Sequence, residues 1–230
     1  MTLQASSPDI SAPTREEEQA DVIRRLEEDI IFGRFAPGSR LVEDTLMTRY
    51  GASRHFVRQA LFQLERQGIV LREKNIGATV RFYSTEEVRQ IYEVREMLTR
   101  QAALMIALPA PAGLIAELAG LQQHYCERAD AKDLRGIHEA NDAFHMALFS
   151  ACGNPYLVRS LQDYMNITLP MRAKNLADKE GLAQSRRQHE LMIELLKGRD
   201  SWAFAQLCVD HMQYSKSDYL GRIARDESTR

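Results

Sequence analysis

Three histidines in the C-terminal half of the chain could together bind a divalent metal ion. His145, His189 and His211 each fall in a separate stretch of helical periodicity, so three different helices would present one imidazole each. Asn141 lies four residues before His145 and shares its helix face, whereas Asp142, three residues before it, is a second choice of oxygen ligand. Spacing alone leaves open that these histidines are ordinary buried or surface residues of a helical protein.

A second group of residues could bind DNA. Over residues 54–67, apolar side chains fall on one arc of a helix and long polar side chains on another. The inward arc comprises Val57, Ala60, Leu61 and Leu64, and the outward arc comprises Arg54, His55, Arg58 and Gln59. Two arginines one turn apart can reach base edges in one major groove, and the helix N-terminus at Ser53 could bind a phosphate. Without further context, the same arginines could simply keep the helix soluble.

The segments around this helix predict a winged helix-turn-helix. Helical periodicity covers residues 17–33 and 42–50, and Gly51 supplies the turn before the helix that carries the arginines. Two β-branched runs follow, at residues 69–72 and 78–82, and predict a small β-hairpin wing. The N-terminal part of the chain is therefore expected to be a DNA-reading module.

From Ser84 onward every segment has helical periodicity, which predicts an all-α bundle of about six helices. The expected helices cover residues 84–108, 113–129, 133–151, 155–177, 182–197 and 201–225. The predicted fold class is mainly α, with an N-terminal winged helix-turn-helix and a C-terminal helical bundle. The expected boundaries are a flexible tail over residues 1–15, a DNA-binding domain over 16–82 and a second domain over 83–230.

Composition places the chain among ordinary soluble proteins, with 44% hydrophobic and 27% charged residues. No segment approaches the roughly 18 apolar residues of a membrane span, and the first fifteen residues lack the features of an export signal. A cytoplasmic protein with reduced cysteines is expected. The net charge is −2, but residues 19–82 carry 11 Lys and Arg against 8 Asp and Glu. That local excess has the sign expected of a DNA-binding domain.

The N-terminal blocks resemble a known family. The segments Gly33–Glu43 and Gly51–Leu61, followed by residues 64–68, are similar in order to the winged helix-turn-helix of GntR-type transcription regulators. In that family, arginines at the start of the third helix contact operator bases, which the resemblance transfers to Arg54 and Arg58.

The resemblance also implies that the wing, with Lys74, Asn75 and Gly77, enters the adjacent minor groove. His55 and Phe56 stand where the family often has a small hydroxyl residue followed by proline, so the operator sequence is not predicted.

The C-terminal domain resembles the FCD ligand-binding domain of the FadR-like GntR subfamily over about residues 85–225. The likeness rests on Asn141 with Phe144-His145, on Gly153-Asn154-Pro155, and on the two later histidines. It implies that Asn141, His145, His189 and His211 bind a divalent metal inside the bundle. Three imidazoles and an oxygen donor suit Zn²⁺, with Ni²⁺ or another first-row ion also open. Asparagine stands here where aspartate is frequent in the family.

The same resemblance implies a small organic or sugar acid as effector beside the metal. Arg95 matches a position from which family members hold a carboxylate, although a surface ion pair is an equal alternative. Arg172 and Asn175 are further candidates for the effector site.

The predicted function is a sequence-specific DNA-binding transcription regulator, expected to be a repressor and a homodimer on an inverted-repeat operator. Two alternatives are a DNA-binding dimer without a ligand and a metal-dependent hydrolase. The chain is not expected to be an enzyme, because Glu190, the nearest base to His189 in the sequence, points about 100° away from it on a helix.

Overall fold

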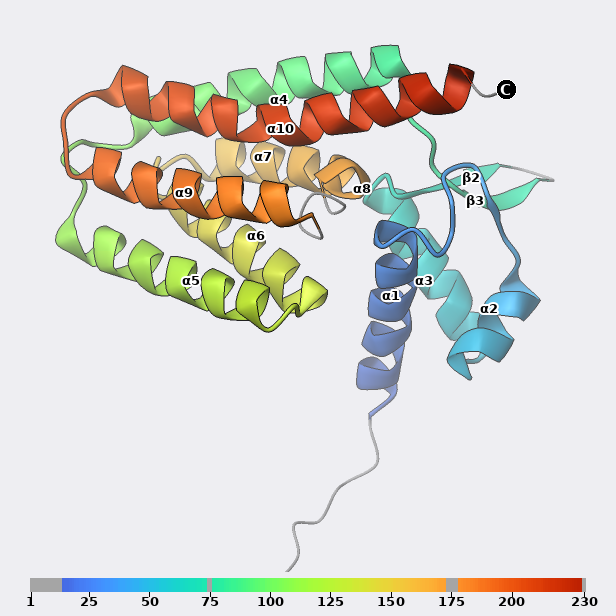
Figure 1. The fold of residues 1–230 in the computed structure, drawn as a ribbon. Helices are drawn as coiled ribbons and strands as arrows, with labels where there is room; N and C mark the ends of the chain where they lie inside the picture. The colour runs from blue at the N-terminus through green and yellow to red at the C-terminus, as the bar shows by residue number, and fades with distance from the viewer. Residues whose placement is uncertain (1–13, 74–75, 173–177, 229–230) are drawn as a thin grey trace, which may run out of the picture.

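The computed structural model describes residues 14–73, 76–172 and 178–228 of the chain. Figure 1 shows a small N-terminal unit of helices and strands beside a larger bundle of long helices. Three short strands are the only ones among the described residues, so the predicted fold class is confirmed. Within the same residues, no helix combines the length and apolar character that a membrane span requires.

The N-terminal unit contains three helices and a three-stranded antiparallel sheet. Its elements are α1 (Arg15–Ile31), β1 (Arg40–Leu41), α2 (Glu43–Tyr50), α3 (Arg54–Arg66), β2 (Val70–Glu73) and β3 (Gly77–Val80). Strands β2 and β3 form the predicted hairpin, with Val70 opposite Val80. Strand β1 was not predicted: Arg40 pairs with Thr79 and gives the sheet order β1-β3-β2. A two-residue strand is too short to show the alternation that identifies strands in a sequence.

The turn between α2 and α3 sets the direction of α3. Gly51 follows α2 with a φ angle of +63°, a left-handed conformation that glycine adopts at little cost. Ser53 then caps α3, because its side-chain Oγ accepts the backbone N–H of Phe56 at 3.3 Å. The predicted helix-turn-helix is thus present, with the predicted turn and cap residues.

The inward arc of α3 packs into the core of the N-terminal unit. Val57, Ala60, Leu61 and Leu64 are all buried there with side chains of α1, α2 and the sheet. The opposite arc of α3 is therefore left facing solvent.

We expect Leu64→Ala to lower the free energy of unfolding by about 2–5 kcal/mol, because it removes buried apolar contacts and leaves a cavity. Chemical denaturation followed by circular dichroism measures this change. Phe62, on the same helix but 48% exposed, provides the control, and Phe62→Ala should shift the value by no more than about 0.5 kcal/mol. Equal losses for the two variants would contradict the burial of Leu64.

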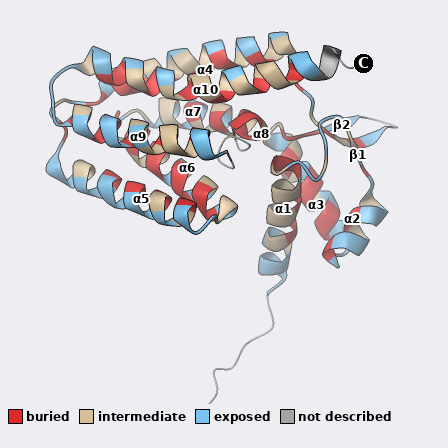
Figure 2. Ribbon diagram, in the orientation of Figure 1, coloured by how far each residue is buried: buried red, intermediate tan, exposed pale blue. Residues whose placement is uncertain are grey.

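The C-terminal unit is a bundle of antiparallel and crossing helices. Its elements are α4 (Thr85–Met105), α5 (Ala112–Asp130), α6 (Leu134–Ser150), α7 (Pro155–Ile167), α8 (Leu169–Arg172), α9 (Lys179–Leu196) and α10 (Ser201–Ser228). Helix α4 packs along α10, α9 contacts both α10 and α5, and α6 packs against α5. Figure 2 shows that the buried faces of these helices are turned toward the interior of the bundle.

One predicted helix, over residues 155–177, is wrong. Helix α7 ends at Ile167, and Thr168 separates it from the short helix α8. Pro170 explains the break, because proline lacks a backbone N–H and its ring does not fit the interior of a continuing helix. The described part of the bundle therefore contains seven helices instead of the predicted six.

Candidate functional site

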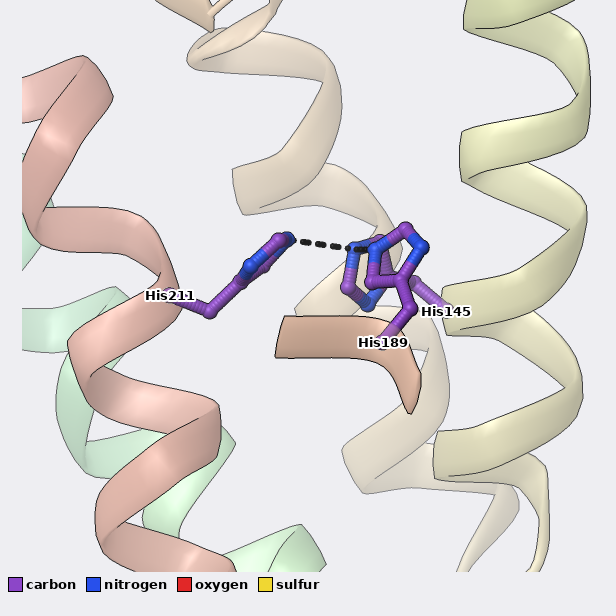
Figure 3. A group of neighbouring side chains, drawn as sticks. All are labelled: His145, His189 and His211. Carbon is purple, nitrogen blue, oxygen red and sulfur yellow. Dashed lines mark hydrogen bonds between the residues drawn. The ribbon is translucent and has the colours of Figure 1, made fainter. Parts of the chain in front are cut away.

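The three predicted histidines meet inside the bundle. His145 of α6, His189 of α9 and His211 of α10 point toward one another (Figure 3). The Nε2 atom of His145 lies 3.1 Å from His211 Nε2 and 3.3 Å from His189 Nε2. The nitrogen atoms that could act as ligands all lie within 4.8 Å of one another. Three helices that are distant in sequence thus bring three imidazole nitrogens to one point.

Two glutamines orient two of these rings. His189 Nδ1 lies 2.9 Å from Gln122 Oε1, and Gln122 Nε2 donates a hydrogen bond to the backbone carbonyl of Arg186 at 3.2 Å. Because that bond orients the amide, Gln122 offers an acceptor to His189, whose Nδ1 therefore donates. His211 Nδ1 lies 2.8 Å from Gln188 Oε1, and because an amide oxygen can only accept, His211 Nδ1 is the donor of that bond. Both rings are left with Nε2 lone pairs facing His145.

The donor set fits a divalent cation. With Nδ1 protonated, the neutral rings of His189 and His211 present only acceptors at Nε2, and one proton on His145 Nε2 would satisfy only one of them. A metal ion takes all three lone pairs at once, and imidazole is a preferred ligand of Zn²⁺ and other first-row ions. Hydrogen bonds from Nδ1 to an outer oxygen, such as those to Gln122 and Gln188, are typical of histidines that bind metals.

Burial keeps the three imidazoles neutral. His189 is fully buried and His145 is 6% exposed. Loss of hydration, followed by electrostatic interactions with His211 and Arg95, holds the pKa of His145 well below its usual range. Burial, followed by Arg95 and Arg172, lowers the pKa of His211 to about 3. Neutral imidazole is the form that binds metal ions, so the group needs no deprotonation at neutral pH.

A cavity of about 60 Å³ adjoins the histidines. Its wall combines side chains of five helices, among them Arg95, Asn141, His145, Arg172, Gln188 and His211. None of the described residues that line it carries a carboxylate, whereas two carry a guanidinium group. The local charge therefore favours a small anion.

Arg95 is buried in the wall of this cavity. Its exposed fraction is only 7%, so the alternative of a surface ion pair is wrong. Its Nη1 donates to Thr168 Oγ1 at 2.9 Å, while its Nε has no hydrogen-bond partner among the described residues. Burial lowers the pKa of Arg95 to about 10, still far above neutral pH. A buried cation with a spare donor is suited to bind a carboxylate.

Asn141 and Asp142 have different surroundings. Asn141 is buried and lines the cavity. Asp142 accepts hydrogen bonds from Arg172 Nη1 at 2.6 Å and Nη2 at 3.0 Å, so its carboxylate is already paired. The geometry therefore favours Asn141 as the oxygen ligand. Arg172 lines the cavity with two donors already used, and Asn175 lies outside the described residues.

The outward arc of α3 presents its arginines to solvent. The Arg54 side chain is 53% exposed, and its Nη2 lies 2.6 Å from Asp44 of α2. The Arg58 side chain is 59% exposed, and its Nε lies 2.9 Å from Glu43 of α2. Exposed ion pairs contribute little to stability, so both guanidinium groups can exchange a carboxylate for a phosphate or a base edge.

The other predicted DNA-binding residues lie around this face. Ser53 and His55 are exposed at the N-terminus of α3. Gly77 begins β3 in the wing, with a φ angle of +98° that favours glycine. Lys74 and Asn75 lie outside the described residues.

Two family models match the two units. Residues 18–80 match the model described as bacterial regulatory proteins of the gntR family, and residues 90–214 match the FCD domain. The FCD match alone covers more than half of the chain. The chain belongs to the GntR family of bacterial regulators and carries an FCD domain. This confirms both predicted resemblances, and with them a DNA-binding transcription regulator.

Curated relatives and solved structures agree with the family. The GntR regulator is 25% identical over 203 residues to the HTH-type transcriptional repressor GlaR of Escherichia coli, covering 84% of this chain and 91% of GlaR. It is 32% identical over 145 residues to the regulator BphR of Paraburkholderia xenovorans, covering 60% of this chain and 59% of BphR. The fold resembles that of E. coli McbR/YncC with a TM-score of 0.71 at 19% identity, over 90% of this chain and 98% of that one.

Gln122 and Gln188 are functional candidates of this FCD regulator that the sequence did not predict. Gln188 precedes His189 in the chain but contacts His211, and Gln122 is 67 residues from its partner His189. No spacing rule connects such pairs, because the packing of α5, α9 and α10 alone brings them together.

Proposed function

We propose that this GntR regulator is a dimeric repressor whose operator binding is controlled by a small carboxylate bound beside a divalent metal ion. The observation that carries this is a group of three converging imidazole nitrogens beside a cavity that is lined by His145, His211 and the buried, incompletely paired guanidinium group of Arg95. The relative GlaR is named a transcriptional repressor, which supports repression as the mode of control.

His145, His189 and His211 would hold the metal, with Asn141 as a neutral oxygen ligand. When bound, a divalent ion supplies a positive charge and an open coordination position for an anionic oxygen. Gln122 and Gln188 keep the rings of His189 and His211 in the tautomer that binds. First-row ions other than Zn²⁺ suit the same ligands.

Arg95 would bind the effector carboxylate. Arg95 lines the cavity and its Nε has no hydrogen-bond partner among the described residues, while Gln184, Ser185 and Tyr214 add neutral donors and acceptors to the same wall. Such groups suit hydroxyl oxygens, and the small volume of about 60 Å³ favours a compact organic or sugar acid.

Binding without turnover is supported by the absence of a base. Hydrolysis by a metal site needs a general base near the metal-bound water, and the described cavity wall contains no Asp or Glu. Glu190, the candidate from the sequence, is exposed beside the fully buried His189.

A dimer would place two α3 helices in successive major grooves of an inverted repeat, since one recognition helix reads too few base pairs for useful specificity. Sedimentation of the purified protein and selection of binding sites from random DNA would test the dimer and the symmetry of the operator. Titration of that operator with the zinc-loaded protein, with and without a panel of organic and sugar acids, tests whether an acid controls operator binding. Unchanged operator affinity with every acid would count against the proposed function.

We expect Arg95→Met to raise the stability of the ligand-free protein and to abolish acid binding. The substitution keeps the volume roughly constant and removes a buried charge that no carboxylate of the described residues pairs with directly. Replacing buried ion pairs with apolar side chains of similar volume is often neutral or stabilising, by up to about 4 kcal/mol, and Arg95 has no paired carboxylate to lose among the described residues. Thermal unfolding measures the gain, and calorimetry with the acid found in the panel measures the loss. Arg100→Met, on the exposed face of α4, is the matched control and should change neither.

A further inference from the structure

The corner between α7 and α8 touches both the cavity and the DNA-reading unit. Thr168 lies between α7 and α8 and is fully buried, and Leu169 begins α8. Leu169 packs into the hydrophobic core that otherwise consists of N-terminal residues, including those of α1. Figure 1 shows α8 at the end of α1, where the two units meet. Met171 of the same helix packs into a core of the C-terminal bundle, so one short segment contributes to two cores.

Both cavity arginines are attached to this corner. Arg95 donates to Thr168 Oγ1 at 2.9 Å, and Arg172 is the last residue of α8. Arg172 pairs with Asp142 of α6 through both Nη atoms, while its buried Nε has no partner among the described residues. A ligand that binds either guanidinium group would act directly on the segment that packs against α1.

Helix α1 also meets the charged groups beside the cavity: Glu28 Oε1 lies 3.5 Å from Arg135 Nε of α6, and the preceding residue, Glu27, interacts electrostatically with Arg172 and Asp142. Glu27 is half-buried, and the charged groups that act on it are Glu28 of α1, Asp142 and Arg135 of α6, and Arg172 of α8. Burial, followed by repulsion from Asp142 and Glu28, raises the pKa of Glu27 to about 7, against the attraction of Arg172 and Arg135. Arg172 is thus shared between the effector cavity and the first helix of the DNA-reading unit.

We propose that Arg172 transmits occupancy of the cavity to the DNA-reading unit through Glu27. This rests on the proposed function, in which the cavity binds an anion. A carboxylate near Arg172 offsets its positive charge, so less attraction remains to balance the repulsion between an ionised Glu27 and Asp142. The docked position of α1 becomes less favourable, and the DNA-reading unit separates more readily from the bundle. Because one charge interacts with both sites, the coupling is reciprocal.

The same arrangement determines how the docking of α1 changes with pH. The pKa of Glu27 is higher when α1 is docked than when this side chain is in water, so docking takes up protons. Docking should therefore be strongest below the ordinary pKa of glutamate and weaken as pH rises toward about 7. Above about pH 7, Glu27 is ionised whether α1 is docked or separated from the bundle. In that range, docking of α1 depends most on the positive charge of Arg172.

Hydrogen exchange of the α1 backbone amides in the full chain tests the link without a ligand. Arg172→Gln imitates neutralisation by a bound anion and should speed exchange in α1 at pH 8 by about tenfold, the equivalent of one pKa unit. In the Glu27→Gln background the same substitution should have little effect. Glu28→Gln is the matched control, because Glu28 contacts Arg135 at the same junction but not the cavity arginine.

The link would be overturned if Arg172→Gln sped exchange in α1 equally in the wild-type, Glu27→Gln and Glu28→Gln proteins. It would also be overturned if Arg172→Lys, which keeps the charge, sped exchange as much as Arg172→Gln. If Arg172→Gln does not fold, the pH profile decides. The exchange rate in α1, corrected for intrinsic rates, should rise between pH 5 and pH 8 in the wild type and in Glu28→Gln. It should stay flat in Glu27→Gln. Parallel pH profiles for all three proteins would refute the proposal. Absence of zinc or of any response to acids, with the coupling intact, would count against the proposed function alone.

Discussion

His211→Ala is expected to reduce bound zinc from about one ion per chain to a trace after dialysis against a weak chelator. The ligands of a structural zinc site together provide a binding free energy of about 10–16 kcal/mol. Loss of one of four ligands should therefore weaken zinc binding by at least about a hundredfold. His211 is the best of the three for this test, since it is less buried than His189 and His145 and its removal leaves the smallest defect. Metal analysis of the dialysed protein measures the loss.

The same variant should bind the operator as the metal-free wild type does, but without responding to an acid. The reason is that α3 belongs to the N-terminal core, which contains none of the three histidines. His124→Ala provides the matched control, because His124 is half-exposed on α5 and pairs with Glu127. Retention of full zinc by His211→Ala would show that the metal binds elsewhere, and an unchanged acid response would separate sensing from the metal.

Gln188 allows a finer test of the same site. An outer partner that holds a metal-binding histidine typically contributes about tenfold to a hundredfold in affinity. Gln188→Ala should therefore weaken zinc binding by less than His211→Ala does, whereas Gln188→Glu, which retains the acceptor, should preserve it.

The DNA-reading unit was predictable because its signals are local. Gly51, Ser53 and the apolar arc of α3 lie within one turn and one helix, so neighbouring residues specify the geometry. Strand β1 was missed, because its two residues become a strand only through pairing with Thr79 and Ala78 of β3. Pro170 signalled the end of α7, yet the helical period that surrounds it suggested one longer helix.

The candidate metal ligands were predictable only in part from spacing. A histidine on each of three helices is a weak pattern, and the FCD resemblance supplied the reason to group them. Spacing could not show that Asp142 is paired with Arg172 while Asn141 lines the cavity, because adjacent residues on a helix face different neighbours. Nor could it show that Arg95 is buried, since that depends on how α4 packs against α10.

Arg54→Ala and Arg58→Ala are each expected to weaken binding to the selected operator by about tenfold to a hundredfold, the usual range for a side chain that reads a base. Both guanidinium groups are exposed on the outward arc, and their partners Asp44 and Glu43 lie on the neighbouring helix α2. Neither substitution removes a buried contact, so thermal unfolding should be nearly unchanged. Fluorescence anisotropy at fixed salt measures the operator affinity, with Arg100→Ala on α4 as the control.

Glu43→Gln adds a test with the opposite sign. In the free protein Arg58 donates to both oxygens of Glu43, at 2.9 Å and 3.0 Å, so DNA must compete with that carboxylate. Removing its charge should tighten operator binding, because Arg58 is released and one negative charge is withdrawn from the face that meets the phosphates. The gain should disappear in the Arg58→Ala background. If Glu43→Gln strengthens binding equally in both backgrounds, the effect is general electrostatics and Arg58 has no specific role in reading the operator.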